Sequence, residues 1–204
     1  MQKRCGMFIL LGLVLLAGCA GFSKPFTDDF SDPASGWGAA STETFVRGYD
    51  SGKYLIRLDA PHWFAWTTAD RNYADVAVEV TVRSEGASDN HFGLLCRYSE
   101  AGFYYFAASS DGYYAIFRRI KGGALEALTG PAMLRTSLLR RGGSDNQLLA
   151  VCQGNELAFY INGEQAALVE DDTFDSGDIG MAAGSLGRGE TTLVWFDDLA
   201  VTEP

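Results

Sequence analysis

"NQLLAVCQGNELAFYING", residues 146–163, decides the fold class of this chain of 204 residues. A short apolar run stands on each side of Gly154-Asn155, and the second run stops at Asn162-Gly163. Apolar runs of this length between turn signals are typical of strands, and Gly and Asn accept the positive φ of a two-residue turn. The stretch therefore predicts a β-hairpin that belongs to the frame of the fold. Its expected core contacts are Leu149, Val151, Leu157, Phe159 and Ile161.

Similar segments recur along the rest of the chain. "ADVAVEVTVRS", residues 74–84, puts its valines on one face and Glu79 and Arg83 on the other. About nine such segments can be counted at a spacing typical of all-β folds, with turn signals such as Asp111-Gly112 between them. No long helical period appears, so we predict one all-β domain over residues 26–204, an antiparallel two-sheet sandwich. The other predicted strands are residues 52–60, 91–99, 102–110, 113–120 and 191–201, with a loop and one short strand at 125–143.

The first 18 residues have the pattern of an export signal. Lys3 and Arg4 precede the apolar run "FILLGLVLLA", which is shorter than the roughly 20 residues that a membrane span needs. The run leads to Leu-Ala-Gly-Cys, which resembles the lipobox of bacterial lipoproteins and implies lipidation of Cys19. An ordinary signal peptide with an incidental cysteine is the alternative. We predict a signal peptide at 1–18, a lipidated tether at 19–25, and a lipid-anchored, extracytoplasmic place in a bacterial cell envelope.

The charge of the chain limits its partners. Removal of 18 residues from 204 would leave 186, and the loss of Lys3 and Arg4 would change the net charge from −10 to −12. An acidic chain repels phosphate backbones and anionic lipid headgroups, so nucleic-acid binding is not expected. We expect contact with the membrane through acyl chains alone.

The cysteines point to one disulfide bond. Of the four cysteines, Cys5 leaves with the signal and Cys19 is expected to be lipidated. Cys96 and Cys152 remain, both in predicted strands of a protein exported to an oxidising compartment. We predict a disulfide between neighbouring strands, and two buried free thiols are the alternative. A zinc site is not expected, because the two cysteines and the two histidines, which are distant from each other, show no ligand spacing.

Motifs in order along the mature chain resemble the concanavalin A-like jelly-roll sandwiches, in particular the laminin G-like and 3-keto-disaccharide hydrolase-like group. The motifs are "DDFSDPASGWG", "GKYLI", "FGLLCRYSEAGFYYFAASSDGYYAI", "SGDIGMAAG" and "WFDDLAV". The resemblance implies two stacked sheets, one of them concave, and often a carbohydrate ligand. It also implies a structural calcium ion between the first and last strands, held here by Asp29, Gly52 and Asp197. Calcium favours six to eight oxygen ligands, so carbonyls or waters would complete the set. Alternatively, Asp197 ends a turn or faces water.

No catalytic motif stands out. Sandwich glucanases of this fold carry Glu-x-Asp-x-x-Glu on one strand, and this chain lacks that motif. Its nearest pair, Asp75 and Glu79, would stand about 13 Å apart along a strand, whereas a retaining mechanism needs about 5 Å. Gly-x-Ser-x-Gly and His-Glu-x-x-His are also missing. Whether the protein is an enzyme stays open, with non-catalysis favoured.

The remaining candidate side chains favour the hypothesis of a ligand-binding surface. Aromatic rings cover the apolar patches of sugars, and charged or amide groups bond their hydroxyls. The candidates are Trp66, Glu79, Arg97 and Tyr105; alternatively, the rings face the core and Glu79 is a solvated surface residue. We predict a non-catalytic domain that binds carbohydrate or surface glycan. The alternatives are a glycoside-acting hydrolase and a structural envelope module that packs against another protein.

Overall fold

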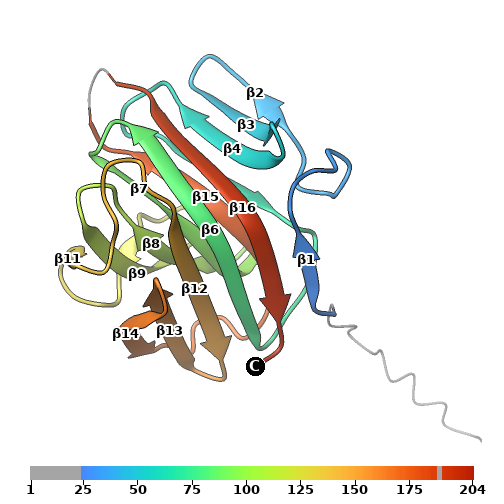
Figure 1. Cartoon of the computed structure of the whole chain (residues 1–204). Helices are drawn as coiled ribbons and strands as arrows, with labels where there is room; N and C mark the ends of the chain where they lie inside the picture. The colour runs from blue at the N-terminus through green and yellow to red at the C-terminus, as the bar shows by residue number, and fades with distance from the viewer. Residues whose placement is uncertain (1–23, 188–189) are drawn as a thin grey trace, which may run out of the picture.

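Two antiparallel β-sheets stack face to face in the computed structural model, which describes residues 24–187 and 190–204 (Figure 1). The predicted all-β, two-sheet architecture is confirmed. The signal peptide, Cys19 and the first part of the tether lie outside the described residues. Within the described ranges, no helix is long and apolar enough to cross a membrane.

Nine strands form the first sheet, called sheet A. Its order is β14-β13-β12-β6-β16-β4-β3-β2, and β1 pairs with β16 beside β4. The long strands β6, β12 and β16 run side by side in Figure 1. The bounds are β1 Phe26–Asp28, β2 Ala40–Ser41, β3 Phe45–Asp50, β4 Lys53–Leu58, β6 Val76–Gly86, β12 Asn146–Gln153, β13 Glu156–Ile161, β14 Glu164–Glu170 and β16 Thr192–Thr202.

Seven strands form the second sheet, called sheet B. Its order is β10-β9-β8-β7-β15-β5, and β11 also pairs with β9. The region 125–143, expected to hold one short strand, holds β10 and β11, and both add to the edge of β9. The bounds are β5 Phe64–Thr68, β7 Asn90–Ser99, β8 Gly102–Ala108, β9 Tyr113–Ile120, β10 Glu126–Ala127, β11 Leu134–Arg135 and β15 Asp178–Ser185.

The core lies between the sheets and follows the period-two pattern. Val76, Val78, Val80 and Val82 of β6 are buried, while Glu79 and Arg83 point to the outer face of sheet A. Sheet B supplies the inward rings of Tyr104 and Phe106 from β8, and Phe106 packs edge-on against the ring of Phe159. The alternation predicted from the valine segment is therefore confirmed.

The hairpin of residues 146–163 forms β12 and β13 and belongs to the frame, but one face of β12 was predicted wrongly. Leu148, Ala150 and Cys152 are buried, whereas Leu149 and Val151 are half-buried on the outer face of sheet A. The run Leu-Leu-Ala-Val-Cys is apolar at its odd and its even positions alike, so its sequence does not fix which residues point into the core. On β13, Leu157, Phe159 and Ile161 face the core as predicted.

The disulfide between Cys96 and Cys152 is confirmed, with a different placement from the one expected. Cys96 lies on β7 of sheet B and Cys152 on β12 of sheet A, so the bond crosses the core between the sheets. It does not join hydrogen-bonded neighbours, because both side chains point inward from facing sheets. The bond therefore ties the two layers together.

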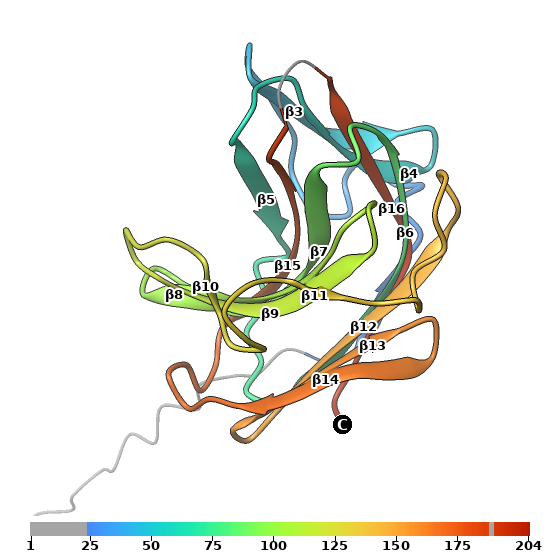
Figure 2. The same ribbon diagram turned by 90° about the vertical axis from the view of Figure 1, so that its left-hand side faces the viewer.

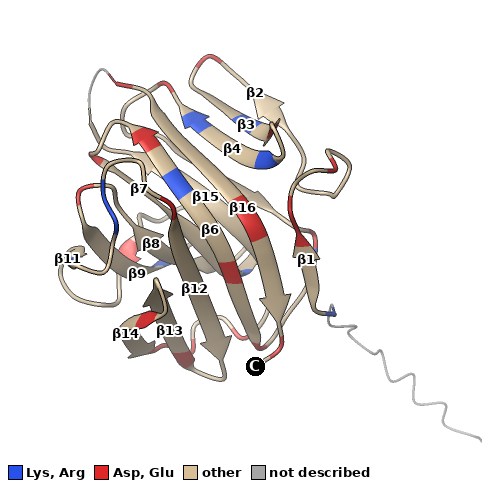
Figure 3. Cartoon of the chain, viewed as in Figure 1, with Lys and Arg blue, Asp and Glu red and all other residues tan. Residues whose placement is uncertain are grey.

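Charged side chains of both signs pair on the outer face of sheet A. Figure 3 shows basic residues on β4, acidic residues on β16, and residues of both signs on β6, which lies next to β16. Lys53 pairs with Asp197, and Arg83 pairs with Glu85 at 2.6 Å. Such exposed pairs contribute little to stability, so this face is best described as a solvated surface.

Candidate functional site

The outer face of sheet B carries a second apolar cluster, separate from the core. Its fully buried members include Leu95, Tyr105 and Ala182, and partly buried rings pack on them. The segment that holds β10 and β11 lies across β8 and β9 and contributes Leu125 and Met133 as a cover (Figure 2). One part of this face is therefore roofed, and the part near the start of β8 stays open.

The face is concave, because side chains from strands far apart in sheet B converge on it (Figure 2). Trp66 on β5 and Arg119 on β9 stand four strands apart, which is about 19 Å on a flat sheet. The Arg119 Cζ atom nevertheless lies 5.7 Å from the centroid of the Trp66 ring. On β15, which lies between β7 and the edge strand β5, Gly184 leaves room for the His91 ring, because a Cβ there would lie 2.1 Å from that ring.

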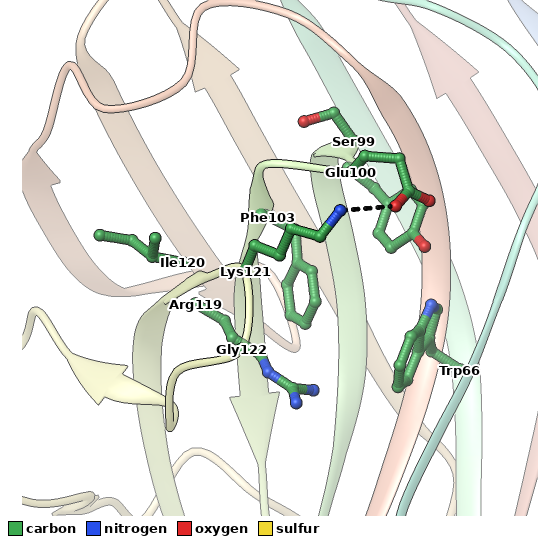
Figure 4. A pocket seen from close by; sticks show the side chains of 10 residues that line it. Trp66, Ser99, Glu100, Phe103, Arg119, Ile120, Lys121 and Gly122 are labelled. Atoms are coloured by element: carbon green, nitrogen blue, oxygen red, sulfur yellow. Dashed lines mark hydrogen bonds and ion pairs between the residues drawn. The ribbon is translucent and has the colours of Figure 1, made fainter.

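The open part of the face holds three aromatic rings and one guanidinium. Trp66, Tyr98 and Phe103 lie with ring centroids 5.8 to 6.3 Å apart. Arg119 is the cross-strand partner of Phe103, and its Cζ atom lies 5.9 Å from that ring. Figure 4 shows its guanidinium pointing towards Trp66. We call Trp66, Tyr98, Phe103 and Arg119 the aromatic platform.

A shallow hollow lies above the aromatic platform. Its volume is about 160 Å³, and Glu100 and Lys121 stand on its rim with a 3.2 Å ion pair between them (Figure 4). Enclosed small-molecule pockets typically measure about 300–1,000 Å³, so this hollow suits a flat group laid on a surface. Apolar rings beneath and charged groups at the rim are the chemistry that it offers.

A β-bulge brings Tyr98 into the platform and removes Arg97 from it. The register of β7 against β8 shifts between Cys96 and Ser99, and Arg97 has a φ of 53°. The extra residue turns Arg97 inward, away from the face that strict alternation along β7 would have it share with Leu95. Its guanidinium donates to the carbonyls of Ala74, Gly154 and Phe174 at 2.8 to 2.9 Å.

Of the four predicted ligand residues, only Trp66 lies in the open site. Arg97 is 1% exposed and acts as a structural donor. Tyr105 faces the same side of sheet B as Trp66 but is fully buried within the apolar cluster, against the rings of Phe64 and Phe117. Glu79 lies on the outer face of sheet A, where it accepts a hydrogen bond from Gln147. The structure does not bring these four side chains together.

Tyr105 and His91 form a buried polar pair beside the platform. The Tyr105 hydroxyl and His91 Nδ1 lie 3.0 Å apart. Burial lowers the pKa of His91 to about 4, and burial raises the pKa of Tyr105 well above its usual value. Both groups are therefore neutral at ordinary pH and stabilise the site as a hydrogen-bonded pair.

The residues predicted to hold calcium do not fit that ion well. The Asp197 carboxylate pairs with the ammonium of Lys53, the residue after Gly52. The Asp29 carboxylate accepts hydrogen bonds from the backbone and hydroxyl of Ser31. Among the described residues, no group of three or more His, Cys, Asp or Glu side chains is placed to hold a metal ion. Lys53 already supplies the positive charge that calcium would bring to Asp197.

Carboxyl groups with altered acidity lie away from the platform. Burial raises the pKa of Asp178, whose carboxylate accepts hydrogen bonds from the backbone of Asp70 and Arg71. Burial also raises the pKa of Asp111, which accepts a hydrogen bond from Ser109. Glu100 is the single carboxylate among the residues that line the hollow. A pair of carboxylates flanking one bound sugar is therefore not found there.

Comparison with known proteins identifies the fold. No known family model and no curated protein sequence matches the chain. A carbohydrate-binding module from Bacillus subtilis is 14% identical, with a TM-score of 0.56 over 83% of this chain and 93% of that chain. A β-glucanase from Bacillus licheniformis is 11% identical, with a TM-score of 0.62 over 89% and 99%. A protein of unknown function with a galectin-like fold from Bacillus subtilis is 10% identical, with a TM-score of 0.65 over 90% and 97%.

Identities this low show the fold alone. The jelly-roll sandwich that the motifs predicted is confirmed. The narrower laminin G-like and 3-keto-disaccharide hydrolase-like group stays a prediction, because the shared architecture serves binding proteins and enzymes alike.

Proposed function

We propose that this protein is a non-catalytic glycan-binding module whose ligand lies on the aromatic platform of sheet B. The observation that carries the proposal is the set of three rings on a concave, partly open face, with a guanidinium beside them. The apolar face of a sugar ring packs on aromatic side chains, and its hydroxyls bond to charged groups at the rim. Solved structures that share the fold include a carbohydrate-binding module and glucanases.

Binding is favoured over hydrolysis by the chemistry of the hollow. Glycoside hydrolysis ordinarily needs two carboxyl groups on either side of the scissile bond, one of them as an acid. The hollow offers Glu100 alone, and that side chain is exposed and paired with Lys121. The platform can therefore hold a sugar but lacks the groups that would cleave it.

We propose that lipidation of Cys19 keeps this module at the bacterial cell envelope. The support is the sequence of residues 1–19, with a basic start, a short apolar run and Leu-Ala-Gly-Cys. Metabolic labelling with palmitate tests the proposal: the wild-type chain should be labelled, and a Cys19→Ala variant should not. Label in both forms, or in neither, would contradict lipidation at Cys19.

A glycan array tests the binding proposal. The full-length protein, purified in detergent, is expected to bind at least one glycan, and Trp66→Ala should weaken that binding about tenfold or more. Trp195→Ala is the matched control, because Trp195 is a half-buried tryptophan on sheet A, held by Asp50. Melting curves of both variants verify folding. Binding to no glycan, or equal loss in both variants, would sink the proposal.

A further inference from the structure

We infer that the ligand of this site is an acidic polysaccharide, a chain of uronic acid sugars. A sugar carboxylate pairs with the Arg119 guanidinium while the sugar ring packs on Trp66. The inference rests on the proposed glycan binding and adds the chemical class of the glycan. Three features of the described residues support it: the free fork of Arg119, the contrast with its neighbour Arg118, and a second arginine-lined hollow next to the first.

Arg119 presents an unused guanidinium edge on an apolar floor. Its Nε donates a 3.1 Å hydrogen bond to the Gly123 carbonyl. In the described part of the chain, no carboxylate lies within ion-pair distance of it, and its terminal nitrogens donate to no described residue. A planar fork of this kind matches a carboxylate in bidentate fashion. The rings around it exclude water and strengthen such a pair.

The preceding residue on the same strand is an arginine with a structural role, and its contacts differ from those of Arg119. Arg118 points to the opposite face of β9 and pairs with Asp171 at 2.7 Å and with Glu126 at 2.8 Å. Both of its terminal nitrogens are therefore satisfied within the protein. Arg119 lacks such partners among the described residues, so its charge is available for a ligand.

A second hollow continues the surface around the edge strand β5. Its volume is about 350 Å³, and Trp66 is a wall common to both hollows. It contains Trp63, which is 39% exposed and stacks on Phe45 with ring centroids 6.1 Å apart. Arg47 lines the same hollow and forms no ion pair within the described ranges.

The two hollows repeat one arrangement: each is lined by a tryptophan that is at least partly exposed and by an arginine. A polyuronate repeats its own arrangement, because every sugar carries one ring and one carboxylate. Consecutive sugars can therefore use Trp66 with Arg119 and Trp63 with Arg47. A chain with a net charge of −10 repels acidic ligands in general, so these two arginines provide the local attraction that selects this surface.

The test compares polyuronates with the same chains after reduction of their carboxyl groups. Polygalacturonate, polyglucuronate and alginate, each with its neutral reduced form, are titrated calorimetrically into the full-length protein, with dextran sulfate as a further probe. At least one polyuronate should bind roughly ten- to hundredfold more tightly than its reduced form. Arg119→Gln should abolish this preference, and Arg83→Gln, an exposed arginine on sheet A, should keep it.

Further variants separate positioning from folding. Arg119→Lys keeps the charge without the planar fork and should retain only part of the preference, which guards against misfolding of the glutamine variant. Trp63→Ala should weaken binding of long chains several-fold more than binding of single uronic acids.

Three results would overturn the inference. Equal affinity for the acidic and the reduced chains would refute it and leave the proposed glycan binding intact. Tighter binding of dextran sulfate than of any polyuronate would refute the inference that the site recognises a carboxylate. If no polysaccharide binds in the titrations and no glycan binds on the array, the inference and the proposed function are both refuted.

Discussion

The disulfide between Cys96 and Cys152 allows a quantitative test of how the two sheets are held together. The two cysteines are 56 residues apart in the sequence, so the bond closes a long loop in the unfolded chain. The chain-entropy relation for such a loop gives about 14 cal/mol/K, or about 4 kcal/mol at 25 °C. In a domain of this size, that loss corresponds to a melting temperature lower by about 8–16 °C.

Oxidised and reduced wild-type protein are the cleanest pair for this measurement. Both forms keep the same side chains, so no cavity is created when the bond is broken. Guanidinium unfolding should show an unfolding free energy about 4 kcal/mol lower after reduction, with a steeper dependence on denaturant because the reduced unfolded chain is more expanded. Alkylation before reduction should modify neither Cys96 nor Cys152. A difference below about 1 kcal/mol would refute the inference that this bond restrains the unfolded state.

Three further predictions concern the frame of the site. Burial lowers the pKa of His91 from 6.5 to about 4, so between these pH values the unfolded state binds more protons than the folded state. The free energy of unfolding should therefore fall by about 3 kcal/mol as the pH falls from 6.5 to about 4. His91→Asn should flatten that dependence, and an unchanged slope would contradict it. Arg97→Met should lower the unfolding free energy by about 3 kcal/mol, since one buried and two partly buried carbonyls lose their donor. Arg83→Met should change it by under about 0.5 kcal/mol. The melting temperature should be the same in calcium and in EDTA, because Lys53 already pairs with Asp197. A higher melting temperature in calcium would contradict this prediction.

Most of the fold could be predicted because the strands of sheet A show strong local signals. The valine alternation of β6 and the turn residues of the β12–β13 hairpin were enough to identify them. Strand β15 of sheet B was not predicted as a strand, since Gly180, Gly184 and the alanines beside them have low strand propensity. Packing explains their presence: His91 and Leu95 of the neighbouring strand lie over those glycines. Such a requirement is visible only in three dimensions.

The site was predicted in part, because of a bulge at Arg97 and because local patterns do not assign strands to sheets. Alternation along β8 and β9 would have placed Phe103 and Arg119 on the same face as Trp66, so these two residues could have been found from the sequence. Tyr98 could not, because the bulge at Arg97 reverses the faces of the residues that follow. Glu79 was grouped with them although it belongs to the other sheet, and no local pattern reveals which sheet a strand joins.

The four tryptophans offer a direct test of where a glycan binds. Trp63 and Trp66 line the two hollows of sheet B, whereas Trp37 is buried with its indole bonded to Asp28 and Trp195 lies on sheet A. Each indole N–H gives its own signal in an ¹H–¹⁵N correlation spectrum of the full-length protein, assigned by single substitutions. On titration with a polyuronate, or with the glycan that the array selects, the Trp66 and Trp63 signals should shift while those of Trp37 and Trp195 stay in place. A shift of the Trp195 signal without one at Trp66, or no shift at any of the four, would contradict a ligand site on the aromatic platform.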